Sequence, residues 1–188
     1  AFLVFTSSHL QRTYGLSPGQ VSWPLGLLIG GVGSIGAVVI GLVCDRLSKK
    51  DLRWRPLIIA LCAAIALPFA WMFLRAPNVG LAYAWNVVPS FVGLIYASIA
   101  YTASQELVQL RMRAFASAFM LFCLTLIGIG CGPWIAGVLS DYFTAQGEAH
   151  PLARALELIL IFNALSILCL LMSSRNYRAD AERAARLD

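Results

Sequence analysis

The fold of this chain is decided by the stretch Gly41-Leu42-Val43-Cys44-Asp45-Arg46-Leu47-Ser48-Lys49-Lys50-Asp51-Leu52-Arg53-Trp54-Arg55. It holds five of the fourteen basic residues and joins two long apolar runs, residues 21–44 and 56–74. Apolar runs of this length are typical of helices that cross a bilayer, and short loops rich in Lys and Arg stay on the cytoplasmic side. We therefore place this loop in the cytoplasm, which orients every other segment.

The composition excludes a soluble domain. Hydrophobic residues make up 60% of the sequence and charged residues 12%, whereas soluble domains carry about 25% charged residues. The net charge of +5 comes from loops and the tail rather than from one basic patch, so it does not indicate nucleic-acid binding. We expect a multi-pass integral membrane protein, in the inner membrane of the cell if its source is bacterial.

The apolar runs predict five complete membrane-spanning helices and part of a sixth. The approximate limits are residues 1–10 for the partial span and then 20–45, 55–75, 80–108, 113–141 and 152–174. Each complete run can cross a hydrocarbon core of ~30 Å. Residues 1–175 would form an all-α transmembrane bundle and residues 176–188 a cytoplasmic tail. Because the chain starts inside an apolar run and without a Met, we expect it to be a fragment whose first helix is truncated.

Several details of the spans follow from single residues. Ser17 and Pro18 are typical of a helix cap and a first-turn proline. Pro89 is expected to kink the third complete span. The second complete span is apolar through its middle, which favours a lipid-facing position. The chosen orientation places eleven of the fourteen basic residues on the cytoplasmic side, in agreement with the positive-inside rule.

A weak internal repeat relates the first and fourth complete spans. Gly41-Leu42-Val43-Cys44-Asp45 aligns with Gly137-Val138-Leu139-Ser140-Asp141, and the same register places Gly36 on Gly132. Asp45 is expected inside the cell and Asp141 outside. Matching sequences on opposite sides of a membrane are typical of two inverted three-helix repeats.

The third complete span has one polar or small face. Its residues recur at intervals of three and four, and they include Tyr83, Asn86, Ser90 and Tyr101. An unpaired polar group in hydrocarbon costs several kcal/mol, so this face should meet protein or water. It is either one wall of a substrate cavity or a helix-packing surface, and the sequence leaves both open.

Rows of small residues mark two spans as packing helices. They include Gly30, Gly36 and Gly41 in the first complete span and Gly132 and Gly137 in the fourth. Small residues let helix backbones approach closely in a bilayer. The same smooth surfaces could also slide past each other during transport.

Charged residues of the two basic loops are candidates for a cytoplasmic gate. These are Asp45, Arg46, Arg111 and Arg113. Asp45 can face the positive N-terminus of a neighbouring helix, and Arg46 can pair with a carboxylate. Contacts of this kind bias a gate when they form in only one conformation.

Glu106 is the ionisable residue nearest to the middle of a span. It lies about one turn from a cytoplasmic loop, within reach of Arg113 or of the Lys49–Lys50 loop. Ionisable groups in a bilayer are costly and therefore candidates for function. Glu106 is therefore a candidate for a structural ion pair or for proton coupling, and the sequence leaves both alternatives open.

The sequence indicates neither an enzyme nor a cofactor or metal site. Glycines 26–41 lie within an apolar span and do not form a phosphate loop between a strand and a helix. No Ser–His–Asp set and no cluster of metal ligands can be recognised.

Three strings resemble the spinster branch of the major facilitator superfamily. The first is Asp45-Arg46-Leu47 with Lys50-Asp51-Leu52-Arg53-Trp54. The others are Gln105-Glu106-Leu107-Val108 with Arg111-Met112-Arg113-Ala114, and Leu126-Ile127-Gly128-Ile129-Gly130-Cys131-Gly132-Pro133. The resemblance implies the C-terminal six-helix bundle of a twelve-helix protein, whose partner is the N-terminal six-helix half. It also implies export of lysophospholipids or sphingoid phosphates.

We therefore expect a secondary transporter that works by alternating access on amphipathic lipid-like or organic anion solutes. One alternative is a facilitator of small organic anions such as sugar acids. Another is a membrane scaffold that does not transport. An apolar, aromatic-lined cavity would favour the lipid, and a buried pair of Arg or Lys side chains would favour the small acid.

Overall fold

The computed structural model describes residues 2–148 and 150–185, and the regular structure of these residues is helical. Helix α1 (Phe2–Tyr14) precedes five helical spans of the described residues that are long and apolar enough to cross a membrane. The expectation of an all-α membrane protein is confirmed. The spans consist of α2 (Pro18–Gly26), η1 (Leu27–Val32) and α3 (Gly33–Ser48); α4 (Trp54–Leu74); α5 (Val79–Gly93) and α6 (Ile95–Glu106); η2 (Leu110–Met112), α7 (Arg113–Cys123), η3 (Leu124–Cys131) and α8 (Gly132–Ala145); and α9 (Pro151–Ala185).

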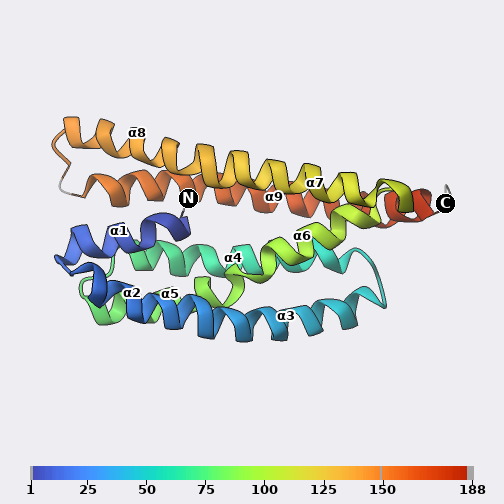
Figure 1. Ribbon diagram of the computed structural model, residues 1–188, viewed down its shortest axis with the longest axis horizontal. Coiled ribbons are helices and arrows are strands. Elements are labelled where there is room, and N and C mark those ends of the chain that lie inside the picture. Colours follow the sequence, from blue (N-terminus) through green and yellow to red (C-terminus); the bar gives the residue numbers. More distant parts are fainter. Residues whose placement is uncertain (1, 149, 186–188) are drawn as a thin grey trace.

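The connections between spans lie at two ends of an elongated bundle. Figure 1 shows the α3–α4 and α6–η2 connections near the C-terminus, and the α1–α2, α4–α5 and α8–α9 connections at the opposite end. We call these the basic end and the opposite end. The alternation matches the order expected from the charges.

Local signals explain where the helices begin and end. Ser17 and Gln20 form a capping box with Pro18 in the first turn of α2, which confirms the predicted start. The Asn78 side chain accepts a hydrogen bond of 2.9 Å from the backbone N–H of Leu81 and caps α5. Gly15 and Gly147 have φ values of 66° and 77°, a left-handed conformation that favours glycine after a helix.

The third span is interrupted at Leu94, between α5 and α6. Pro89, where the sequence predicts a kink, lies inside α5, and the helix continues past it to Gly93. Figure 1 shows α5 and α6 running in different directions. The face predicted from a single continuous helix is therefore divided between two helices.

The two spans related by the internal repeat share an unusual backbone. The first contains the π-helical segment η1 before α3, and the fourth contains the π-helical segment η3 before α8. Segments of this type are uncommon, and here they occupy corresponding places in spans that run in opposite directions. The backbone thus agrees with two inverted three-helix repeats.

Helix α4 buries one face in the bundle and leaves a second apolar face, which includes Leu61, Ile65 and Trp71, exposed; the predicted lipid-facing position therefore holds for that second face. It packs against α9 on one side and against α5 and α3 on the other (Figure 1). Ala60 and Ala70 are buried on it, together with Ile59 and Phe73. Hydropathy could not reveal which face of α4 is buried, because a helix needs apolar residues whether it meets lipid or protein.

The C-terminal residues continue helix α9. Tyr177, Ala181 and Ala184 are buried, so the part of the predicted tail from residue 176 to residue 185 is a helix that packs back on the bundle. Residues 186–188 of the predicted tail, and Ala1 of the partial span, lie outside the described residues.

Candidate functional site

A cavity of about 370 Å³ lies between α4, α5, α6 and α9, at mid-length of the spans. Its walls are mostly apolar, with Ile59 and Ala66 from α4, Ile99 from α6 and Leu160 from α9. Among the described residues that line it, none carries a charge. Mostly apolar cavities with a few polar groups are the usual form of small-molecule sites.

Besides the phenol of Tyr96, three polar side chains line this cavity. Asn86 and Ser90 lie one turn apart on α5, and each is only 3% exposed. The Ser90 Oγ is buried and has no hydrogen-bond partner among the described residues. A buried hydroxyl without a partner costs about 1–3 kcal/mol. A solute or water in the cavity could supply the missing partner.

The third polar residue, Asn163, faces the cavity from α9. A lone Asn in an apolar span has no periodic partner, so the sequence gives no reason to place it at a site. The only available signal was the depth of Asn163 in its span, which resembles that of Asn86 in another span. Only the packing of α9 beside α4 and α5 brings the two amides to one cavity.

The two tyrosines predicted for the cavity lie elsewhere. Tyr83 packs against the apolar cluster that contains Leu10, Phe73 and Leu156, and its hydroxyl has no hydrogen-bond partner among the described residues. Tyr101 lies beyond the interruption of the third span and is half-buried outside the cavity lining. The aromatic residue that lines the cavity is Tyr96 on α6.

Of the predicted packing glycines, Gly36 makes the closest approach to another helix. A Cβ atom at Gly36 would collide with the backbone of Phe91 on α5. A Cβ atom added at Gly41 would lie 3.6 Å from the Cδ1 atom of Ile95. Gly30 and Gly137 face open space within the described chain, and Gly132 is half-buried at the start of α8. Helix α3 therefore packs on α5 directly beside the cavity residue Ser90.

Glu106 forms an ion pair near the basic end of the bundle, and its partner is Arg55, at the end of the basic loop. Arg55 Nη2 lies 2.8 Å from Glu106 Oε1, and the two side chains are 16% and 24% exposed. The Tyr177 hydroxyl lies 2.9 Å from Glu106 Oε2 and 3.0 Å from the carbonyl oxygen of Ala103, as a donor to either. The cluster joins α4, α6 and α9. Of the partners expected from the sequence, the basic loop supplies the cation through Arg55, whereas Arg113, Lys49 and Lys50 form no ion pair with Glu106 among the described residues.

The four predicted gate residues lie on the surface of the basic end. Asp45 and Arg46 are exposed on the last turns of α3, and Arg113 is exposed at the start of α7. Arg111 donates a hydrogen bond of 3.1 Å to Gln109 Oε1. Within the described residues none of the four forms an ion pair, so their role as a gate stays a prediction.

Comparisons with known proteins agree with this arrangement. The sequence is 32% identical over 183 residues, 97% of this chain, to an MFS-type efflux pump of Mycolicibacterium smegmatis. The structure resembles a crystal structure of a bacterial homolog of the human lysosomal transporter Spinster in an inward-facing, occupied conformation. That match has a TM-score of 0.64 and 19% identity over 97% of this chain. No family model matches the sequence.

The chain spans about half the length of these relatives, 42% of the efflux pump and 46% of the Spinster homolog.

Proposed function

Because this chain belongs to the major facilitator superfamily, we propose that it is one half of a secondary transporter that works by alternating access. The chain is a multi-pass membrane protein whose two three-helix sets match one half of such a fold. A second six-helix bundle would complete the solute path. The four exposed charged residues of the basic end, Asp45, Arg46, Arg111 and Arg113, would then contact that bundle in one state and release it in the other.

The observation that carries this proposal is the uncharged cavity with its unpartnered Ser90 hydroxyl. The apolar walls can hold a hydrocarbon segment, while Asn86, Ser90 and Asn163 can bind a few polar atoms. We infer that the solute is amphipathic, of the lysophospholipid or sphingoid phosphate type. A sugar acid has no hydrocarbon segment to fill these apolar walls, so we place it second.

Flux measurements on the full-length protein in proteoliposomes test this function. We expect net movement of a fluorescent lysophospholipid, and Ser90→Leu should reduce it about tenfold, because the larger side chain overpacks the cavity. Ser173→Leu makes the same replacement at an exposed position of α9 outside the cavity lining and should leave flux unchanged.

Three results would contradict the proposal in different ways. Flux of a sugar acid without lysophospholipid flux would favour the small-anion alternative. Equal flux in the Ser90→Leu protein and its control would exclude this cavity as the solute site. A lack of flux for every solute, in both directions and with or without a pH gradient, would favour a scaffold that does not transport.

A further inference from the structure

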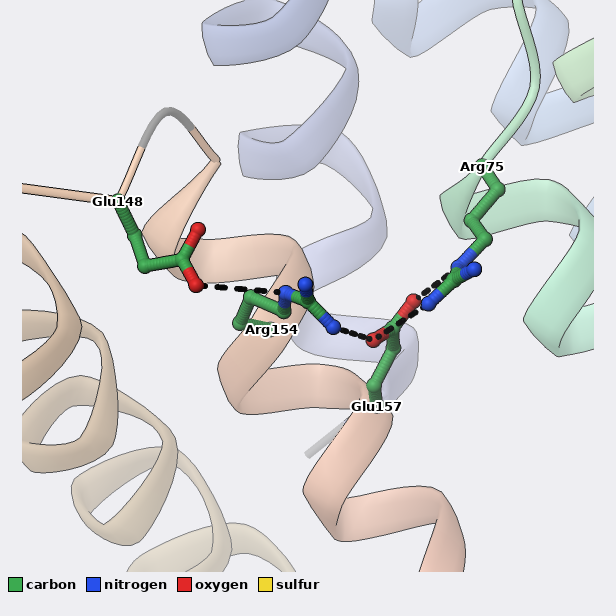
Figure 2. Close-up of polar contacts among 4 residues, drawn as sticks. All are labelled: Arg75, Glu148, Arg154 and Glu157. Carbon is green, nitrogen blue, oxygen red and sulfur yellow. Dashed lines mark hydrogen bonds and ion pairs between the residues drawn. The ribbon is translucent and has the colours of Figure 1, made fainter.

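A second group of charged residues lies at the opposite end, where α4 ends and α9 begins. Figure 2 shows Arg154 between Glu148 and Glu157, with Arg75 on the other side of Glu157. Arg75 and Glu157 form the firm part of the group, with hydrogen bonds of 2.6 Å and 3.3 Å. These bonds raise the pKa of Arg75, whose guanidinium also lies 4.4 Å from the Trp71 ring centroid. The pair thus fixes Glu157 in place.

Arg154 is held much less firmly. Its Nη1 is 3.3 Å from Glu157 Oε2, its Nε is 3.6 Å from Glu148 Oε1, and the side chain is 50% exposed. Good charge-assisted hydrogen bonds are about 2.7–2.9 Å long, and a guanidinium has five N–H donors. Arg154 therefore keeps donors for an anionic group, and the loosely held Glu148 keeps acceptors for a cationic one.

Two cavities flank this group and share Glu148, Arg154 and Glu157. The first, of about 520 Å³, runs between α4, α8 and α9 and is lined by apolar side chains such as Trp71 and Ile161. The second, of about 360 Å³, is more polar and reaches His9 on α1. His9 is 1% exposed, and its Nε2 has no hydrogen-bond partner among the described residues. Polar and apolar spaces thus meet at the charged group.

The depth of the two spaces matches the layers of a bilayer. Arg75 and Arg154 lie at the ends of apolar spans, at the level of lipid headgroups. The apolar cavity continues down α9 to Ala164, ten residues and thus about 15 Å deeper than Arg154. The polar groups therefore face headgroups, and the apolar walls face acyl chains.

We propose that this site binds one zwitterionic phospholipid of the outer leaflet, with its phosphate on Arg154, its amine beside Glu148 and one acyl chain in the apolar cavity. Two arginines and two glutamates alternate there without net charge, which complements a headgroup that carries one charge of each sign. The site goes beyond the proposed transport function. Among the described lining residues it shares only Leu160 with the cavity around Asn86.

Photolabelling of the full-length protein in nanodiscs tests the site. The probe is phosphatidylethanolamine with a diazirine in one acyl chain, in a background of phosphatidylglycerol, and mass spectrometry locates the label. We expect label on residues 158–164 and 67–71, and Arg154→Ala should lower it about tenfold through loss of the charge-assisted contact. Arg12→Ala, at an exposed arginine of the same end, should leave it unchanged.

A second variant tests the tail independently of the charged group. Ala164→Trp fills the apolar cavity from an exposed position and should also abolish the label, while thermal unfolding checks that both variants fold. Label that is spread over all lipid-facing helices and insensitive to both variants would indicate ordinary boundary lipid and overturn the proposal. Equal labelling by the matched phosphatidylglycerol probe would overturn the zwitterionic assignment.

Discussion

The ion pair between Arg55 and Glu106 is the clearest case of a single contact that connects distant parts of the chain. Charged side chains are costly near hydrocarbon unless they are paired. Glu106 ends α6, Arg55 begins α4 and Tyr177 belongs to α9, so one carboxylate receives contacts from two other helices. We attribute to this cluster the packing of α9 beyond the predicted end of its span.

Substitutions in this cluster should reduce stability by different amounts. Arg55→Met leaves a partly buried carboxylate without its cation and should lower the free energy of unfolding by about 2–3 kcal/mol. Tyr177→Phe removes one hydrogen bond and should cost about 1 kcal/mol. Unfolding of the full-length protein in detergent gives both values. Arg53→Met, at an exposed arginine of the same loop, should stay within about 0.5 kcal/mol, and additive effects of the first two changes would show that Arg55 and Tyr177 are not coupled.

At the scale of elements, the contact between α3 and α5 sets the shape of the candidate site. Gly36 lies against the backbone of Phe91, and Gly33 lies close to the carbonyl oxygen of Ser90. This approach holds α5 with Asn86 and Ser90 turned towards α4 and α9. The small residues of α3 therefore affect the shape of the cavity through their contact with α5, although they do not line it.

A methyl group at Gly36 should push the two helices apart. Gly36→Ala is expected to destabilise the protein by about 1–3 kcal/mol, because the added atom meets backbone that cannot rotate away. Gly30→Ala, in open space on the same span, should change stability by no more than about 0.5 kcal/mol. Thermal unfolding of the two variants side by side makes the comparison. A Gly36→Ala protein as stable as the Gly30→Ala protein would contradict the close contact.

At the scale of the whole molecule, the two ends of the bundle differ in charge and in role. The basic end carries the α3–α4 loop, the Arg55–Glu106 pair and the exposed gate residues. The opposite end carries the alternating Arg and Glu group around Arg154. The positive-inside rule places the first end in the cytoplasm.

Labelling of single cysteines checks this orientation in cells. In a background without the native cysteines, a maleimide that cannot cross membranes should react with Gln146→Cys in intact cells, because Gln146 is exposed at the opposite end. It should react with Lys49→Cys only after the cells are opened. The reverse pattern would invert the bundle and refute the assignments of gate and lipid site together.

How much could be predicted depended on the range of the interaction. The cap at Ser17 arises from neighbours in sequence, so local rules sufficed for it. The interruption of the third span lies at Leu94, beyond the kink predicted at Pro89. The partner of Glu106 could be narrowed only to Arg113 or the basic loop, since Arg55 is far from Glu106 in the chain and several cations lie in that loop. Only part of the cavity lining could be predicted. The periodicity of one helix indicates a polar face, but it does not indicate which other helices meet that face.

The sequence by itself determined that the chain spans a membrane several times, which end carries the positive charge, and which superfamily its motifs resemble. These properties depend on hydropathy, loop charge and local motifs, each readable along the chain. Only the tertiary structure decided which face of α4 is buried, that Asn163 joins Asn86 and Ser90, and that Arg154 borders an apolar cavity. The physical reason is that lipid-facing and protein-facing helices need the same apolar composition, so their neighbours follow only from how the surfaces pack.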